Sequence, residues 1–430
     1  MLELLGILVF AAGLLFSIAW HEIGHLLPAK KFGVKVTQYM VGFGPTLWSR
    51  NKGETEYGIK AIPMGGYIRM VGMFPPKADG TKDDSLGRFG TMIESARVDA
   101  LAEIEPGEEA RAFYNLSAPK KLTIMFGGPF MNLILAFVLF IAVFSGFGLP
   151  KPVPTVSSIT ACVPTDSNPS GIASVDGSCA DGEVTSATTL GLQAGDVITA
   201  INGTPIKNWG DIGLALQPLA GSDADVTYIR DGLSVTKNVK IATLNYTDDS
   251  GKPVSRGFIG MSPSTQWEKQ SPTVVPGVMG TMMKETFTRL FDLPKKVVQT
   301  GVDLVTGNER DANGPVSVVG IGRISGQVAA SGVMDTRTKL ATMVELLASV
   351  NLLLFVFNMV PLLPLDGGHI AGAIYEGIRR QVARFSGRKK LPGPADTAKM
   401  LPVAYVVSLF LVVMSVVIIL ADIFNPLNLG

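Results

Sequence analysis

Charge of either sign is scarce in this sequence. Only 17% of its 430 residues are Asp, Glu, Lys or Arg, 47% are hydrophobic, and the net charge is +1. No basic run is interleaved with aromatic residues, which argues against nucleic acid as a partner. The chain is too apolar for an ordinary soluble enzyme and has too many polar stretches to consist of membrane helices alone. The composition therefore predicts a membrane protein, with lipid around it, that carries a soluble part.

Cysteine is equally rare. Cys162 and Cys179 are the only two, and both fall in a long polar stretch between hydrophobic runs. Their spacing does not fix a geometry, so a disulfide that closes a short loop and a pair of free thiols both remain open. A structural zinc site at this pair is not expected, because no histidine is near it in the sequence.

Histidine is the third scarce residue, and two of the three in the chain stand four positions apart. They belong to the run His21-Glu22-Ile23-Gly24-His25, which follows an uncharged stretch over residues 4–20. Residues four apart on a helix lie on one face, so both imidazoles can bind one divalent metal with Glu22 beside it. This is the HExxH pattern of zinc peptidases, and it predicts a hydrolytic metal site within an apolar helix.

Four stretches are apolar and long enough to cross a bilayer, which takes about 20 residues of helix. They comprise residues 4–27, 122–149, 346–365 and 401–421. The first is not expected to be a removable signal peptide, because no Lys or Arg precedes it and no small-x-small cleavage site follows it. The predicted fold class is therefore a polytopic α-helical membrane protein with four transmembrane helices.

Basic residues are distributed unevenly around these stretches. Clusters follow the first, precede the second and separate the third from the fourth: Lys30, Lys31, Lys35, Lys120, Lys121, Arg379, Arg380, Arg384, Arg388, Lys389 and Lys390. The positive-inside rule places these clusters in the cytoplasm. Both termini and residues 150–340 are then expected outside, and the HExxH run lies toward the cytoplasmic side of a multi-pass protein.

The spans predict a division of the chain. In order, it comprises transmembrane helix 1 with the HExxH run (1–29), a cytoplasmic loop with a glycine-rich β-hairpin (30–121), transmembrane helix 2 (122–149), an extracytoplasmic α+β domain (150–262), an extracytoplasmic amphipathic helical region (263–345), transmembrane helix 3 (346–369), a cytoplasmic loop (370–400) and transmembrane helix 4 (401–423). In the amphipathic region, one apolar face predicts a helix on the outer membrane surface. That face consists of Met282, Met283, Phe287, Leu290 and Phe291.

The loop after the first span contains two extended runs bounded by glycines. Gly42-Phe43-Gly44-Pro45 breaks the chain, and Gly65-Gly66-Tyr67 lies in the second run. The pattern predicts a hairpin or small sheet associated with the membrane. It is either a plain surface loop or a strand edge beside the metal that hydrogen-bonds an extended substrate.

Polar side chains lie at two places within the predicted spans. An amide facing lipid is costly, so Asn132 in the second span is expected to face protein or a cavity, either as an interhelical hydrogen bond or as a substrate contact. Asp366 ends the third span, where a carboxylate is expensive unless it is paired or binds a metal. On the residues alone, Asp366 and His369 are equal candidates for a third metal ligand.

The long polar stretch contains the run Gly191-Leu192-Gln193-Ala194-Gly195-Asp196, followed by an apolar strand pattern and an Asn202-Gly203 turn. A short helix is predicted near residues 209–217. This arrangement resembles a PDZ domain of the bacterial protease type, so residues 150–262 are predicted to form an extracytoplasmic α+β PDZ domain.

Together these motifs resemble the site-2 protease family of intramembrane zinc metalloproteases, peptidase family M50, in its bacterial and actinobacterial-like form with one PDZ domain. The last motif that carries the resemblance is Asn358-x-x-Pro361-x-x-Pro364-Leu365-Asp366-Gly367-Gly368. The resemblance implies one Zn²⁺ per chain, held by His21, His25 and Asp366, with Glu22 as the catalytic base. It also implies that the hairpin clamps the substrate and that further residues line its path. The implied substrate-binding residues are Gly65, Gly66, Tyr67, Asn132, Asn358 and Pro361.

The resemblance implies a function in the bacterial plasma membrane. The expected reaction is cleavage, near the cytoplasmic side, of single-span membrane proteins such as anti-sigma factors already cut by another protease, or remnant signal peptides. The PDZ domain is expected to filter substrates by the size of their outer part. Two alternatives remain open: a membrane-anchored zinc peptidase that acts on soluble or loop peptides at the cytoplasmic surface, and an inactive PDZ scaffold.

Overall fold

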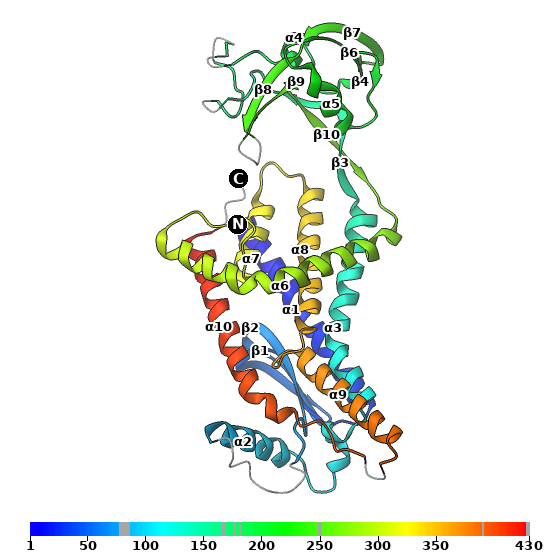
Figure 1. Cartoon of the computed structure of the whole chain (residues 1–430), viewed down its shortest axis with the longest axis vertical. Helices are drawn as coiled ribbons and strands as arrows, with labels where there is room; N and C mark the ends of the chain where they lie inside the picture. The colour runs from blue at the N-terminus through cyan, green and yellow to red at the C-terminus, as the bar shows by residue number, and fades with distance from the viewer. Residues whose placement is uncertain are drawn as a thin grey trace. The chain divides into compact units, whose positions relative to one another are not determined.

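The chain divides into two compact units in a computed structural model. The model describes residues 1–76, 87–165, 168–174, 178–179, 182–247, 252–388 and 391–426. Unit 1 comprises Met1–Phe147 and Ser271–Gly430, and unit 2 comprises Gly148–Gln270 (Figure 1). Lys389 and Lys390, which contributed to the predicted sidedness, lie outside the described residues.

Helices make up most of unit 1. Their bounds are α1 Leu2–Lys31, α2 Arg88–Ala102, α3 Ala118–Ile141, α6 Val275–Thr306, α7 Val318–Ala330, α8 Thr336–Asn358, α9 Asp366–Phe385 and α10 Leu401–Phe424. A π-helical turn, Ala142–Phe147, extends α3. Four helical segments are long and apolar enough to cross a membrane: Leu2–Lys31, Ala118–Phe147, Thr336–Asn358 and Thr397–Phe424. The four predicted apolar helices are therefore confirmed by length and composition.

The third of these helices differs from the prediction of a span over residues 346–369. Helix α8 begins at Thr336, where the Asp335 side chain accepts a hydrogen bond from the Thr338 amide, and it ends at Asn358. Two prolines follow and stop it, because proline lacks the amide that a helix interior needs. Asp366 then opens a separate helix, α9, so much of the predicted loop 370–400 is helical.

A β-hairpin joins α1 to α2. Its strands are β1 Val36–Lys52 and β2 Thr55–Met70, and several register shifts interrupt their pairing. Residues 38–41 of β1 pair with residues 66–69 on one side and with residues 56–59 on the other. The sequence predicted the hairpin but not this double pairing, which makes residues 66–69 an edge of the small sheet. No other strand within the described residues pairs with that edge.

Helices α1, α3 and α8 pack against one another and form the centre of unit 1. Helix α6 runs across α8 and α10 (Figure 1). Its buried Val275 and Met279 join one apolar cluster and Val297 joins another, whereas Phe287 and Phe291 are exposed. Of the apolar face predicted for this helix, Met282 and Met283 pack partly buried against the first cluster, so only Phe287 and Phe291 are exposed.

Unit 2 is a mixed α+β unit. Its strands are β3 Leu149–Ile159, β4 Val197–Ile201, β5 Thr204–Pro205, β6 Asp223–Arg230, β7 Leu233–Lys240, β8 Ala242–Thr247, β9 Pro253–Phe258 and β10 Met261–Glu268, and its helices are α4 Ser186–Leu190 and α5 Trp209–Leu216. The main sheet has the order β10-β3-β4-β6-β7, with β5 paired to β4. Asn202 and Gly203 both have positive φ, as a tight hairpin turn between β4 and β5 requires.

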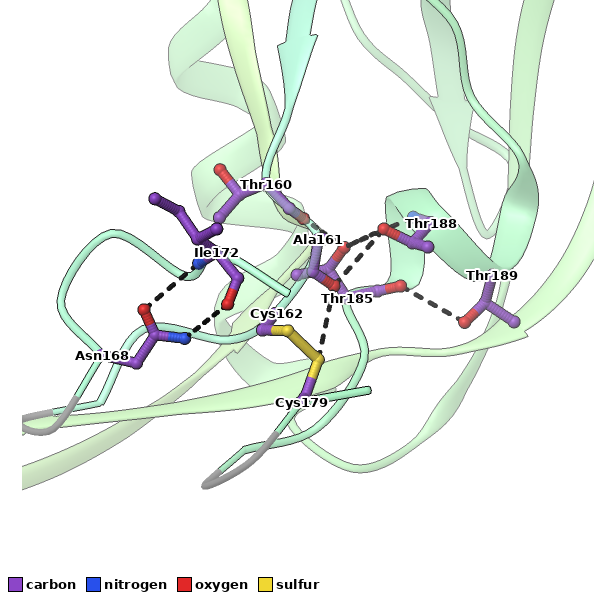
Figure 2. The surroundings of a disulfide bond; sticks show 9 residues. All are labelled: Thr160, Ala161, Cys162, Asn168, Ile172, Cys179, Thr185, Thr188 and Thr189. Carbon is purple, nitrogen blue, oxygen red and sulfur yellow. Dashed lines mark hydrogen bonds between the residues drawn. A yellow bond between two sulfur atoms is a disulfide. The ribbon is translucent and has the colours of Figure 1, made fainter. Parts of the chain in front are cut away.

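Cys162 and Cys179 form a disulfide bond, which settles the alternative that the sequence left open. Figure 2 shows the bond beside the start of α4. There the Thr185 hydroxyl donates to the Thr160 carbonyl at 2.6 Å, and the Thr185 amide donates to the Ala161 carbonyl at 3.0 Å. The disulfide and these hydrogen bonds hold the loop after β3 against the helix that precedes the Gly-Leu-x-x-Gly-Asp turn.

Candidate metal centre

Three metal-binding side chains converge in unit 1 from two helices that are far apart in the sequence. His21 and His25 lie one turn apart on α1, and Asp366 is the first residue of α9. The Asp366 Oδ2 atom lies 3.2 Å from His21 Nε2 and 3.3 Å from His25 Nε2. The two Nε2 atoms are 3.1 Å apart. His369 lies three positions further on and is not part of this cluster.

The three donor atoms form a nearly equilateral triangle of the size that a tetrahedral zinc site needs. Bonds of 2.0–2.2 Å to nitrogen and oxygen at tetrahedral angles give donor separations of about 3.3–3.6 Å. The observed sides of 3.1–3.3 Å are close to these values. Two imidazoles and one carboxylate with an open fourth position are also a donor set found in catalytic zinc sites.

The orientation of His25 supports this assignment. Its Nδ1 atom lies 2.8 Å from the main-chain carbonyl of Ile124 on α3. A carbonyl can only accept, so Nδ1 carries the proton and Nε2 of the neutral ring presents a lone pair to the other ligands. The His21 Nδ1 atom is buried and has no hydrogen-bond partner among the described residues.

Glycines of α3 leave the space in which the ligands meet. A Cβ atom at Gly128 would lie 2.1 Å from His25 Nε2 and 2.7 Å from His21 Nε2. A Cβ at Gly127 would lie 2.0 Å from the Gly24 carbonyl oxygen, so α1 and α3 are in backbone contact beside the ligands. No local signal in the sequence marks Gly128 as a wall of the metal centre.

Glu22 lies beside the two histidines and is only 7% exposed. The main-chain amide of Ile68 on β2 lies near its carboxylate. The hairpin also packs directly on this side chain, because a Cβ at Gly66 would come within 3.0 Å of Glu22 Cγ. The edge of the sheet therefore borders the metal centre.

A cavity of about 530 Å³ contains the metal centre. Five of the six predicted substrate-binding residues line it: Gly65, Gly66, Tyr67, Asn132 and Asn358. Pro361 does not line it and is exposed. Asn132 is 0% exposed, and both atoms of its amide lack a hydrogen-bond partner within the described part of the chain.

Other lining residues were not identified from the sequence. They include Ile18, Met70, Met125 and Leu354. Each is an apolar residue within a helix or strand, and nothing in its sequence context separates it from an ordinary core position. Their role follows only from the way α1, β2, α3 and α8 come together.

Comparison with known proteins gives matches over most or all of the chain. A model of peptidase family M50 matches residues 9–391. Zinc metalloprotease Rip1 of Mycobacterium tuberculosis is 32% identical over 442 residues, which cover 100% of both chains. Zinc metalloprotease Rip1 of Mycolicibacterium smegmatis is 33% identical, with 99% of this chain and 98% of that protein covered. Regulator of sigma-W protease RasP of Bacillus subtilis is 24% identical, with 84% and 87% covered.

The comparison with solved structures also gives a match to a PDZ domain. It is the PDZ domain of an SdrC-like protein from Listeria monocytogenes, at 19% identity and a TM-score of 0.16. The match covers 26% of this chain and 87% of that one. A TM-score this low carries no structural conclusion.

Proposed function

The chain belongs to peptidase family M50 and is a zinc metalloprotease, and we propose that His21, His25 and Asp366 hold the zinc while Glu22 acts as the general base. The observation that carries this assignment is the triangle of donor atoms with sides of 3.1–3.3 Å. Glu22 follows the first ligand in the chain and faces the same cavity as all three.

The proposed mechanism divides hydrolysis between the metal and the chain. Bound zinc makes a water molecule more acidic and polarises the carbonyl of the bond to be cut. Glu22 accepts the proton of the attacking water and delivers it to the leaving amine. The Ile124 carbonyl keeps the His25 ring in the tautomer that binds metal, which is the usual role of such a hydrogen bond.

The edge formed by residues 66–69 is the proposed substrate clamp. A transmembrane substrate has its amides bonded within its own helix, so it must be unwound before a bond can be cut. Adding the unwound segment to a free strand edge replaces those hydrogen bonds. Gly66 and Tyr67 lie on this edge and line the cavity, and Asn132 and Asn358 offer amides to the same segment from α3 and α8.

The proposed substrates are single-span membrane proteins, such as anti-sigma factors already cut by another protease, or remnant signal peptides. One relative is named a regulator of sigma-W protease, which fits a role in regulated intramembrane proteolysis. In this proposal the protein lies in the bacterial plasma membrane, with both termini and unit 2 extracytoplasmic and the metal centre toward the cytoplasm. Unit 2 acts as a PDZ domain that filters substrates.

The Glu22→Gln variant tests the proposal. We expect it to bind one zinc per chain, since the ligands are unchanged, and to lose activity by about 10²–10⁴-fold or more, since the base is lost. The measurement is cleavage of a purified single-span membrane protein in detergent, with zinc quantified by mass spectrometry. Wild-type turnover by Glu22→Gln would contradict the assignment. Cleavage of peptides without a span, and not of the single-span protein, would favour a peptidase of the cytoplasmic surface.

A further inference from the structure

His369 is the one histidine that the metal centre does not use, and it borders two cavities. One is the cavity of about 530 Å³ around the metal centre, which we call the main cavity. The other has a volume of about 20 Å³ and is called the side chamber. Among the described residues that line them, only His369 and Met73 belong to both. His369 therefore forms part of the wall between the two spaces.

Polar side chains line much of the side chamber. They are Tyr114, Lys121, His369, Glu376 and Thr397. A buried water needs about 10–15 Å³ of such space and typically makes about three hydrogen bonds. The side chamber has the room for a water and more than enough groups to bind it. An apolar cavity of this size would instead stay dry.

A buried ion pair lies at the side chamber. Lys121 Nζ on α3 is 2.7 Å from Glu376 Oε2 on α9, and the two side chains are 6% and 1% exposed. The Oε2 atom also accepts a hydrogen bond from the Ala395 amide at 3.0 Å. The second carboxylate oxygen, Oε1, lies 3.0 Å from Arg380 Nη1 but accepts no hydrogen bond from a residue within the described ranges. A buried carboxylate oxygen that accepts no hydrogen bond favours a water molecule that donates one to it.

We propose that the side chamber holds the water that supplies the metal centre, and that His369 is a positioning residue that passes this water into the main cavity. Each peptide bond that is cut consumes one water molecule. A neutral imidazole carries one donor and one acceptor nitrogen, so it can bind a water on each of its two sides. The Lys121–Glu376 pair keeps the side chamber hydrated because its charges are costly without polar partners. The inference rests on the proposed peptidase function.

Radiolytic labelling tests the water directly and needs no activity. Brief X-ray pulses convert bound water into hydroxyl radicals, which oxidise the side chains next to it. Phe113 lines the side chamber and is only 5% exposed, whereas Phe140 is 0% exposed within an apolar cluster of α3 and α8 and serves as the matched control. In the full-length wild-type chain we expect oxidation of Phe113 and not of Phe140. In Ala373→Leu, which fills the side chamber, oxidation of Phe113 should fall. Equal protection of both phenylalanines in the wild type would overturn the proposal.

Kinetics of two His369 variants test the positioning role. We expect His369→Leu to lower kcat on the order of 10- to 100-fold while KM and zinc content stay unchanged. His369→Gln keeps a donor and an acceptor and should recover most of the loss. Tyr375→Phe, an exposed residue of the same helix, is the control and should match the wild type. A wild-type kcat for His369→Leu would overturn the proposal. If the wild-type chain cleaves no substrate, the proposed function fails, and the labelling of Phe113 still decides whether the side chamber is wet.

Discussion

The lack of a side chain at Gly128 leaves room for the metal centre. The three proposed ligands come from α1 and α9, yet the space that they share is bounded by the backbone of α3. A methyl group at Gly128 would overlap the Nε2 atom of His25, so the ring would have to turn away from the other ligands. Turning it would also break the hydrogen bond from Nδ1 to Ile124. The geometry of the proposed ligands and the close approach of α3 therefore both depend on the glycine at this position.

We predict that Gly128→Ala weakens zinc binding by at least about 10–100-fold, the range seen when a ligand loses its orienting partner. The measurement is competition for zinc with a chelator of known affinity. Gly146→Ala is the matched control, because a Cβ at Gly146 meets no atom within 4 Å. Unchanged affinity in Gly128→Ala would show that the described approach of α3 to the two rings is wrong.

At the scale of elements, the hairpin acts through its contact with α1. A Cβ at Gly66 would lie 2.9 Å from Ile18 Cγ2 and 3.0 Å from Glu22 Cγ. A larger side chain at this position would push the edge of the sheet away from the catalytic face of α1. None of the three atoms nearest to a Cβ at Gly66 belongs to a proposed zinc ligand, so metal binding and substrate clamping can be separated by experiment.

The Gly66→Val variant is expected to keep its zinc and to lose most of its cleavage activity, since the displaced edge no longer aligns the substrate with Glu22. Single-turnover cleavage and zinc content measure the two effects on the same sample. Ile59→Val, at an exposed position of the other half of β2, serves as the control. Loss of zinc together with activity would mean that the hairpin supports the metal centre rather than the substrate.

The Gly-Leu-x-x-Gly-Asp turn of unit 2 is held by an ion pair. Asp196 is 2% exposed, and its oxygens accept from Arg230 Nε at 2.8 Å, Arg230 Nη2 at 2.6 Å and the Gln193 amide at 2.8 Å. The hydrogen bond from Arg230 keeps the pKa of the Asp196 carboxyl below its ordinary value, against the opposing effect of burial. A carboxyl whose pKa is lower in the folded state stabilises the fold above its unfolded pKa and loses this contribution as the pH falls.

Unit 2 should therefore lose stability as the pH falls below about 4, near the ordinary pKa of an aspartate. Hydrogen exchange of the β4 amides, corrected for the intrinsic effect of pH, measures this loss in the full-length chain. Asp196→Asn should be less stable than the wild type at pH 6 and should show a smaller loss between pH 6 and pH 3. Equal losses in both chains would assign the acid sensitivity to other carboxyl groups.

At the scale of the whole molecule, sequence patterns predict local structure but not the contacts between residues that are distant in the chain. Apolar length predicted the four long helices, and the i, i+4 spacing predicted that His21 and His25 share a face. The start of α8 was missed because its first turn is polar, although Asp335 is a recognisable N-cap. Helix α9 covers residues that were predicted as the end of the third span and the start of a cytoplasmic loop. The double pairing of β1 depends on contacts between distant residues, so no local pattern could predict it.

The sequence alone does not distinguish the two candidates for the third ligand, whereas the structure does. Residue chemistry leaves Asp366 and His369 as equal candidates, since both carboxylate and imidazole bind zinc. The fold separates them by one turn of α9. Asp366 reaches both histidines of α1, whereas His369 lies at the wall between the main cavity and the side chamber. We therefore propose different tasks for the two residues.

Zinc content of two variants tests this division most directly. Asp366→Ala and His369→Ala, purified in the same way as the full-length wild type, are compared by metal analysis of the protein after removal of loosely bound zinc. We predict about one zinc per chain for the wild type and His369→Ala, and little or none for Asp366→Ala, since zinc then has only two protein ligands. Full zinc in Asp366→Ala together with its loss in His369→Ala would contradict the account.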